Sequence, residues 1–198
     1  MATPPALPPP TEDRLRAYAA LLLSWTRRIN LVSGGDQDAI WTRHVADSLR
    51  LVPLLPPGLD RAIDLGSGGG LPGLVLAIAT GVRFELVESD QRKAAFLREA
   101  ARVTEAPVQV HAVRIEACVL EPAALVTARA LAPLPGLLAL AAPLLRPGGV
   151  MLFPKGARAA TELDAARTEW DFGVDQVGGA DSPILCVTAP RRLEHAHV

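Results

Sequence analysis

One glycine-rich stretch constrains the fold of this chain more than any other feature of its sequence. The stretch reads Ile63-Asp64-Leu65-Gly66-Ser67-Gly68-Gly69-Gly70-Leu71-Pro72-Gly73 and joins an apolar, strand-like run to a helical one. Glycine reaches positive φ at little cost and has no Cβ to keep a ligand away from the backbone. In doubly wound sheets such a turn lies at the carboxyl end of the first strand, where ligands bind. The stretch therefore predicts a ligand-binding strand–loop–helix unit, and Pro72 suits the first turn of its helix.

Short apolar runs alternate with helical stretches after the proline and glycine breaks between Pro53 and Gly58. Helices are expected between most of these runs, notably over Gln91–Ala106 and Leu134–Leu145. This alternation predicts right-handed βαβ units and a doubly wound, Rossmann-like α/β sheet. Only a short turn over 178–183 separates the last two strands, so the seventh strand should run antiparallel. The predicted strands are Arg61–Leu65, Phe84–Ser89, Val108–His111, Leu125–Ala128, Gly149–Phe153, Phe172–Val177 and Ile184–Ala189.

The first 58 residues follow a different pattern, which predicts a helical extension before the sheet. Apolar residues spaced three or four apart begin after Glu12, and Thr11 is expected to cap this first helix. A second helix is expected over Gln37–Leu51, with Asp36 as its cap and with Ile40, Val45 and Leu49 facing inward. The predicted division is a disordered proline-rich tail over 1–10, the extension over 11–58, the α/β domain over 59–190 and a C-terminal tail over 191–198.

Two classes of ligand could use the glycine loop. The segment from Gly68 to Gly73 matches the G-x-G-x-x-G pattern of dinucleotide sites, and Glu88 stands at the right distance for a ribose hydroxyl. Asp64 argues against a dinucleotide, because a carboxylate at this strand end would repel a pyrophosphate. S-adenosylmethionine carries an ammonium and a sulfonium group without phosphate, so it suits the acidic strand end better. Simpler alternatives stay open, in which Asp64 only bonds loop amides and Glu88 is a solvated carboxylate.

Composition sets further bounds on the protein. The net charge of −1 gives no sign of a nucleic-acid partner, so any such contact must come from local basic patches. Cys118 and Cys186 match no disulfide or metal spacing, which predicts apolar fillers and no metal site. No signal peptide is recognisable at the N-terminus, and the apolar runs are too short to cross a bilayer. A cytoplasmic protein without membrane contact is therefore expected.

Several motifs together resemble one protein family. The stretch from Asp64 to Gly73 resembles the first motif of the RsmG (GidB) family, bacterial methyltransferases that modify N7 of a guanine in 16S ribosomal RNA. Trp25–Ser33 is similar to the family's W-N-x-x-x-N-L-T-S, and Arg43–Ser48 to its R-H-x-x-D-S. Later similarities follow in the family's order, at Glu88-Ser89 with Lys93, Phe96 and Leu97, at Val113–Glu116, at Thr127–Ala130, at Leu145–Gly149 and at Lys155-Gly156.

The resemblance implies a class I methyltransferase sheet of seven strands and S-adenosylmethionine as cofactor, with S-adenosylhomocysteine as product. Glu88 would take the ribose hydroxyls, Ile115 and Glu116 would meet the adenine, and Arg129 would lie beside the cofactor and the incoming base. The implied cofactor-binding residues are Gly66, Gly68, Leu71, Glu88, Ile115, Glu116 and Arg129. Two departures from the family pattern are Thr26, in place of the asparagine after Trp25, and Ala124, where an aspartate is usual.

The resemblance also implies a partner, 16S ribosomal RNA in the 30S subunit or its precursor, and we expect a monomer. Guanine N7 offers a lone pair without a proton, so methyl transfer needs positioning rather than a general base, and no catalytic residue is assigned. Arg43, His44 and Lys155 are the strongest candidates for RNA contact, although each alone could be a solvated or structural side chain. The open alternatives are a methyltransferase acting on another substrate, a nicotinamide-dependent oxidoreductase and a non-catalytic RNA-binding factor.

Overall fold

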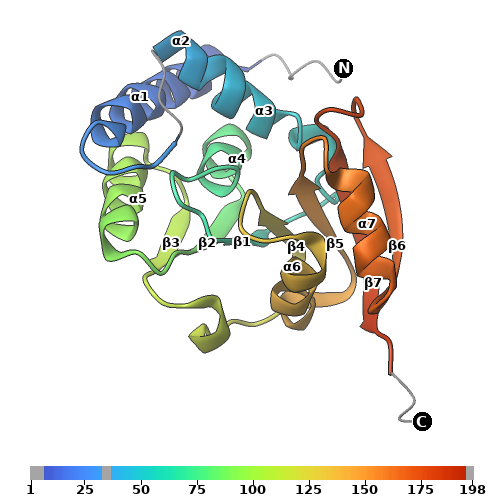
Figure 1. The fold of residues 1–198 in the computed structure, drawn as a ribbon. Coiled ribbons are helices and arrows are strands. Elements are labelled where there is room, and N and C mark those ends of the chain that lie inside the picture. Colours follow the sequence, from blue (N-terminus) through green and yellow to red (C-terminus); the bar gives the residue numbers. More distant parts are fainter. Residues whose placement is uncertain (1–6, 33–36, 195–198) are drawn as a thin grey trace.

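The computed structural model describes residues 7–32 and 37–194 (Figure 1). Within this part of the chain a mixed sheet of seven strands has the order β3-β2-β1-β4-β5-β7-β6. Neighbours among the first five strands pair in parallel, whereas β7 is antiparallel to both β5 and β6. The strands are β1 Arg61–Leu65, β2 Arg83–Val87, β3 Val108–His111, β4 Ala123–Ala128, β5 Leu145–Pro154, β6 Trp170–Val177 and β7 Ile184–Arg192. The predicted doubly wound fold with an antiparallel last strand is therefore confirmed.

The helices cover the sheet on its two faces (Figure 1). Helices α1, α4 and α5 pack against one another on one face, and α6 and α7 pack together on the other. Alternate strand residues point to opposite faces, so Ala62 joins the first core cluster and Ile63 the second. The helical elements are α1 Pro9–Thr26, α2 Gln37–Ile40, the π-helical turn Trp41–Val45, α3 Ala46–Leu49, α4 Gly73–Thr80, α5 Gln91–Thr104, α6 Leu134–Ala141, α7 Ala159–Arg167 and the short 3-10 turns Val52–Leu54, Ile115–Ala117 and Ala142–Leu144.

The structure corrects several predicted boundaries. Helix α1 begins at Pro9 with Pro8 as its N-cap, so the predicted cap at Thr11 is wrong. Proline is well tolerated there, because the first helical N–H groups have no partner within the helix. Strand β2 ends at Val87, which leaves Glu88 outside the sheet. The expected cap at Asp36, residues 1–6 of the predicted tail and residues 195–198 lie outside the described residues.

Two residues of the predicted C-terminal tail belong to the sheet. Arg191 and Arg192 are the last residues of β7. Arg191 pairs with Asp171 at 2.9 Å, and Arg192 lies 3.8 Å from the carboxylate of Glu169. These exposed contacts extend the pairing of β7 with the start of β6, so the sheet continues further than the apolar pattern indicated.

Helix α1 is part of the same core as the sheet domain. Leu15, Tyr18 and Leu22 are fully buried in the cluster that also holds α4 and α5. The guanidinium of Arg14 donates to the carbonyl oxygen of Ile78 at 3.1 Å and to that of Thr104 at 3.5 Å. These carbonyls lie in the last turns of α4 and α5, where helices leave acceptors without partners. The N-terminal extension is thus joined to the helices that frame the glycine loop.

Candidate functional site

The glycine loop connects β1 to α4 at the carboxyl edge of the sheet. Gly66 has a φ of +63°, and a Cβ on this residue would lie 2.6 Å from the Cδ1 atom of Leu131. Gly73 opens α4, and a Cβ there would lie 2.5 Å from the Cβ atom of Asp64. Gly66 is required because its φ is positive, which other residues rarely adopt. At both Gly66 and Gly73 a larger residue would also collide with a neighbouring side chain. The loop sequence therefore allows α4 and the segment after β4 to approach the end of β1 closely.

Two side chains hold the backbone of the loop from outside. The carboxylate of Glu88 accepts hydrogen bonds from the backbone N–H groups of Gly68 and Asp90, both at 2.8 Å. Only 7% of Glu88 is exposed, so it is not the solvated carboxylate that the sequence left open. From α1, the hydroxyl of Tyr18 donates to the carbonyl oxygen of Gly69 at 2.5 Å. The loop is thus fixed on one side by the end of β2 and on the other by the N-terminal extension.

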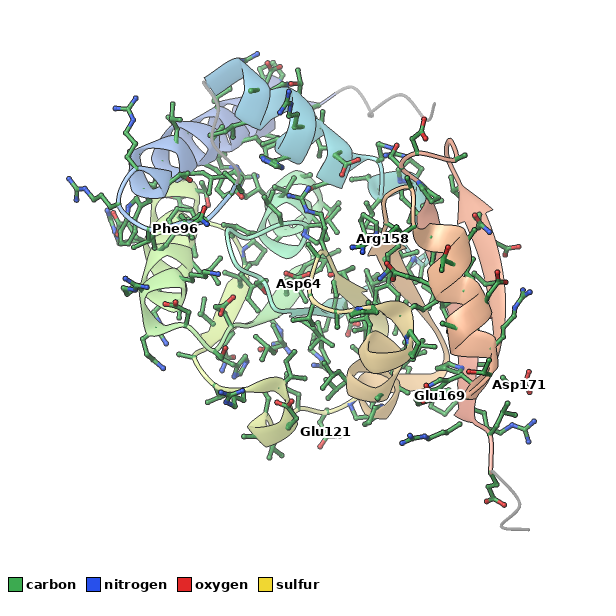
Figure 2. The ribbon with its side chains drawn as sticks, in the orientation of Figure 1. Asp64, Phe96, Glu121, Arg158, Glu169 and Asp171 are labelled. Carbon is green, nitrogen blue, oxygen red and sulfur yellow. The ribbon has the colours of Figure 1, made fainter. Side chains whose placement is uncertain are left out.

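Asp64 is a buried carboxylate in the middle of the molecule, at the end of β1 (Figure 2). Its Oδ1 atom accepts a hydrogen bond from the hydroxyl of Thr127 at 2.6 Å, whereas its Oδ2 atom has no hydrogen-bond partner within the described residues. Burial raises the pKa of Asp64 to about 6, although Thr127, Ser67 and the N–H of Gly73 favour the charged form. The site therefore contains a buried acceptor whose negative charge is only partly compensated.

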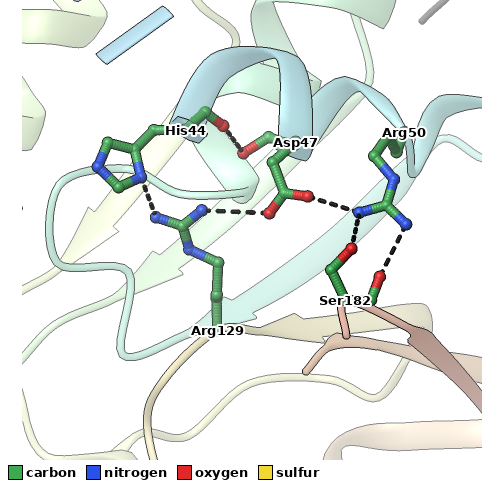
Figure 3. A network of polar contacts seen from close by, with 6 residues as sticks. His44, Asp47, Arg50, Arg129 and Ser182 are labelled. Atoms are coloured by element: carbon green, nitrogen blue, oxygen red, sulfur yellow. Dashed lines mark hydrogen bonds and ion pairs between the residues drawn. The ribbon is translucent and has the colours of Figure 1, made fainter. Parts of the chain in front are cut away.

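A polar network connects the N-terminal extension to the end of β4 (Figure 3). The Nδ1 atom of His44 accepts a hydrogen bond from the guanidinium of Arg129 at 2.9 Å. Asp47 lies 3.5 Å from the same guanidinium and binds Arg50 at 2.7 Å. Arg50 in turn donates to the carbonyl oxygen of Ser182, in the turn between β6 and β7, at 2.8 Å. Arg129 is thus held by the segment that carries the R-H-x-x-D-S motif.

A cavity of about 920 Å³ opens beside the glycine loop. Its lining includes Arg129 and Leu131 from the segment after β4, and Lys155 and Arg158 from the segment between β5 and α7. The side chain of Leu131 also lies against Gly66, so this one side chain lies between the cavity and the glycine loop. Arg158 precedes α7 and is exposed (Figure 2), which makes it a cation available to a ligand in the cavity. This volume is of the size that binds a small molecule or a nucleobase with its sugar.

The predicted RNA-contacting residues differ in how accessible they are. Arg43 is exposed on the π-helical turn of the extension. Lys155 is only 10% exposed, and its ammonium donates to Glu162 at 2.7 Å and to the carbonyl oxygen of Ala132 at 3.2 Å. Glu162 also accepts the backbone N–H of Leu134 at 3.0 Å. Lys155 therefore holds the cavity wall in place, and a contact with RNA would have to share its ammonium with these partners.

The remaining predicted cofactor residues lie near the same edge of the sheet. Leu71 is buried between the loop and α4. Ile115 and Glu116 form a 3-10 turn after β3, where Ile115 is half-buried against the second core cluster and Glu116 is exposed. No cluster of metal-ligating side chains occurs among the residues that the structure describes.

Ala124, which departs from the family pattern, and several residues without a predicted functional role pack in or against the core. Ala124 is buried inside β4, one residue into the strand rather than ahead of it. Cys118 and Cys186 are half-buried against the two clusters, as expected of small apolar side chains. Trp25 packs its ring edge-to-face with Phe96, with 5.6 Å between the ring centroids.

The sequence did not assign roles to Tyr18, Asp47 or Thr127. Each acts through a partner that is distant along the chain. The available signals were a single tyrosine on an otherwise apolar helix face and the aspartate of the R-H-x-x-D-S motif. Neither signal indicates its partner, because the contacts form only when the extension packs on the sheet.

Solved structures of several methyltransferases share this architecture. An O-methyltransferase from Bacillus cereus, in complex with SAH, matches with a TM-score of 0.57 and 17% identity over 93% of this chain and 92% of that chain. The ribosomal protein L11 methylase of Lactobacillus delbrueckii subsp. bulgaricus matches with a TM-score of 0.62 and 12% identity, over 79% of this chain and 81% of that chain. At such low identity these matches show the fold alone.

Comparison of the sequence with known proteins identifies the family, which the structural matches do not. The family model described as rRNA small subunit methyltransferase G matches residues 11–179. The ribosomal RNA small subunit methyltransferase G of Granulibacter bethesdensis is 59% identical over 164 residues, which cover 83% of this chain and 77% of that protein. Its counterpart from Rhodospirillum centenum is 55% identical over 189 residues, which cover 93% of this chain and 88% of that protein. The chain therefore belongs to the rRNA small subunit methyltransferase G family and is a methyltransferase with a doubly wound α/β fold.

Proposed function

We propose that the protein transfers a methyl group from S-adenosylmethionine to N7 of a guanine in 16S ribosomal RNA. The observation that carries this proposal is the position of the cavity. Its wall contains Arg129 and Leu131, and Leu131 also touches the glycine loop, so a base in the cavity would lie next to a cofactor on the loop. The family membership supports the same reaction, because the relatives are named as methyltransferases of the small-subunit RNA.

The residues at the loop fit S-adenosylmethionine. The free Oδ2 atom of Asp64 supplies negative charge near a cofactor that is cationic at two positions. Gly68 lets a ligand approach the backbone, because a Cβ there would meet only the carbonyl oxygen of Gly66 at 3.7 Å, and Glu88 is held at the edge where a ribose would lie. We infer that the cofactor-binding residues are Gly66, Gly68, Leu71, Glu88, Ile115 and Glu116, and that Arg129 lies beside the cofactor on the side of the incoming base. The buried carboxylate of Asp64 also argues against a nicotinamide dinucleotide, whose pyrophosphate would be repelled.

The proposed methyl transfer needs no proton transfer by the protein. S-adenosylmethionine supplies a methyl group on a sulfonium, which the N7 lone pair attacks while the carbon–sulfur bond breaks. No proton moves, and the positive charge passes from sulfur to the guanine ring. The side chains therefore act by orienting the base, excluding water and placing charge. Arg129 and Arg158 are donors that line the cavity, and the O6 atom of guanine is an acceptor next to N7.

The substrate is RNA in the 30S subunit or its precursor, and the exposed arginines contact its phosphates. Arg43 is exposed next to His44, and Arg158 is exposed in the lining of the cavity, whereas Arg27 and Arg28 follow the end of α1. Lys155 takes part from the cavity wall, and His44 from the helical turn that contacts Arg129. We propose a cytoplasmic monomer without membrane contact. In the described part of the chain no helix is long and apolar enough to span a bilayer.

The test is transfer of labelled methyl from S-adenosylmethionine to 16S ribosomal RNA that lacks its native modifications, with 30S particles in parallel. We expect label on N7 of one guanine, located by borohydride and aniline cleavage of the RNA. Gly66→Ala should reduce labelling at least about tenfold, because it adds a Cβ at positive φ against Leu131. Gly136→Ala is the matched control, since this exposed residue of α6 has an open environment and should keep wild-type labelling. Binding of S-adenosylhomocysteine without label on either substrate would overturn the ribosomal assignment.

A further inference from the structure

The R-H-x-x-D-S segment lies against Arg129 rather than against the glycine loop. His44, Asp47 and Arg50 are spaced three residues apart and lie along one side of the helical segment (Figure 3). The π-helical turn Trp41–Val45 contains His44 and passes directly into α3, which contains Asp47. Such wide turns occur often at functional sites. The side of the extension that faces the sheet thus presents one acceptor and one carboxylate to Arg129.

The contact with Arg129 defines the proton state of His44. A guanidinium has only donors, so the Nδ1 atom of His44 must accept and the ring must be neutral, with its proton on Nε2. Burial and the nearby charges of Arg129 and Arg43 lower the pKa of His44, while Asp47 acts in the opposite direction. Arg43 and Asp47 belong to the same helical segment as His44, and Arg129 comes from the end of β4.

Asp47 provides the second contact with Arg129 and is itself held by Arg50. Its carboxylate lies between Arg129, at 3.5 Å, and Arg50, at 2.7 Å. Arg50 reaches the turn between β6 and β7, where it packs on Gly178 so closely that a Cβ would clash with its guanidinium. The side chains of Arg50 and Arg129 are only 14% and 19% exposed. The guanidinium of Arg129 is thus held at both of its terminal nitrogens from the N-terminal extension.

An arginine beside the N7 edge of guanine creates a chemical difficulty. The commonest arginine contact with guanine is bidentate, to O6 and N7 together. A hydrogen bond to N7 would occupy the lone pair that has to attack the methyl group. An arginine that serves this reaction must therefore be restrained so that it cannot take N7.

We propose that His44 and Asp47 are positioning residues, which hold Arg129 at the cavity wall so that it can donate to O6 of the acceptor guanine while N7 stays free. This inference rests on the proposed function, and it gives the R-H-x-x-D-S segment a part in the transfer step rather than in cofactor binding. Loss of either contact lowers the rate of methyl transfer and leaves the affinity for the cofactor product nearly unchanged.

The proposal is tested with two substitutions at His44. Asn presents its amide oxygen near the position of Nδ1 and cannot take up a proton, whereas Leu removes the acceptor. At pH 8 we expect His44→Leu to lower kcat about tenfold or more, and His44→Asn to stay within about threefold of wild type. The affinity for S-adenosylhomocysteine, measured by calorimetry, should change less than about twofold in both variants. Asp47→Asn should resemble His44→Leu, because its amide no longer attracts the guanidinium as strongly.

The pH profile gives a signal that a structural role would not produce. Protonation of His44 removes the acceptor and places a cation against Arg129, so wild-type kcat should fall at acidic pH. His44→Asn should lack this fall, while His111→Asn, at the histidine that binds Glu85 away from the cavity, should keep it. Nitrogen NMR of labelled histidine should show His44 with its proton on Nε2.

Two results would overturn the proposal. One is wild-type kcat in both His44→Leu and Asp47→Asn. The other is an equal loss of kcat and of S-adenosylhomocysteine affinity in these variants, which would place them in the cofactor site or in folding. Failure of the proposed function is distinguished from both, because the wild-type protein itself would then not label the RNA.

Discussion

Asp64 shows at the scale of one residue how a buried carboxylate costs stability. Its carboxylate is fully buried, and one oxygen has no hydrogen-bond partner among the described residues. A buried polar atom without a partner is costly unless a ligand compensates it. The pKa of about 6, against an ordinary value of 3.8, expresses that cost for the charged form. Protonation relieves this cost in the free protein at acidic pH, and a cation or donor that reached the strand end would relieve it at neutral pH.

We therefore expect Asp64→Asn to stabilise the free protein and to weaken cofactor binding. The amide can offer its oxygen to the N–H of Gly73 and its N–H to the hydroxyl of Thr127. Because the folded state of the wild type takes up a proton between about pH 6 and pH 4, its own stability rises as the pH falls through this window. The variant should thus have the higher Tm at pH 7.5, and this advantage should shrink below pH 5.

Thermal melts across this pH range, with and without S-adenosylhomocysteine, measure both effects. The ligand should raise the Tm of the wild type more than that of Asp64→Asn. A variant that is less stable than the wild type at pH 7.5 would show that the Oδ2 atom already has a favourable partner.

Helix α1 supports the glycine loop, a role that the sequence did not predict. Its apolar face predicted packing, and Leu15, Tyr18 and Leu22 are indeed buried. Yet the hydroxyl of Tyr18 donates to the carbonyl oxygen of Gly69, inside the glycine loop. Burial raises the pKa of Tyr18, so the hydroxyl keeps its proton and remains a donor throughout the physiological range. The extension thus supports the loop as well as covering the sheet.

Tyr18→Phe keeps the packing and removes only this donor. We expect the affinity for S-adenosylhomocysteine to fall about three- to tenfold, because the loop loses one restraint and the carbonyl oxygen of Gly69 is left without a partner. At saturating cofactor, kcat should stay near the wild-type value. Ser24→Ala is the matched control on the same helix, since this exposed hydroxyl bonds only the carbonyl oxygen of Leu21. Unchanged affinity in Tyr18→Phe would contradict a supporting role for α1.

The sequence predicted the sheet well and the details of the helical segments less well. Apolar runs of strand length are local signals, so each predicted strand exists. The second helix was expected to be regular over Gln37–Leu51, but it contains the π-helical turn. The inward residues Ile40, Val45 and Leu49 are buried as expected, although a π-helical turn lies between the first two. The apolar spacing therefore predicted the buried face of this segment but not the irregular turn that contains His44.

The site itself could be predicted only in part. The glycine loop and Glu88 follow from local spacing along one strand–loop–helix unit. The partner of His44 lies 85 residues away, and the pairing of Lys155 with Glu162 depends on how α7 folds back over the cavity. Such contacts depend on the register of packed helices, which no periodicity encodes. The sequence therefore indicated which residues matter more reliably than what each one contacts.

At the scale of the whole molecule, the extension and the sheet form one packed body. The first core cluster contains Leu22 of α1 together with Leu74 of α4 and Phe96 of α5. The extension is also tied to the turn between β6 and β7 through Arg50. A division into an extension and a domain therefore describes the chain order rather than independent folding. Elements that share one core unfold together in small proteins.

The three tryptophans allow this cooperativity to be measured. Trp25 and Trp41 report on the extension, and Trp170, at the start of β6, reports on the opposite side of the sheet. A Trp170→Phe variant leaves only the first two as probes, and a Trp25→Phe/Trp41→Phe variant leaves only Trp170. In each variant the fluorescence transition in urea should coincide with the loss of helical circular dichroism, because both probes follow the same event. If the extension were a separate unit, Trp25 and Trp41 would change at lower urea than the circular dichroism. The shared core would then contribute less free energy than the burial of Leu15, Tyr18 and Leu22 implies.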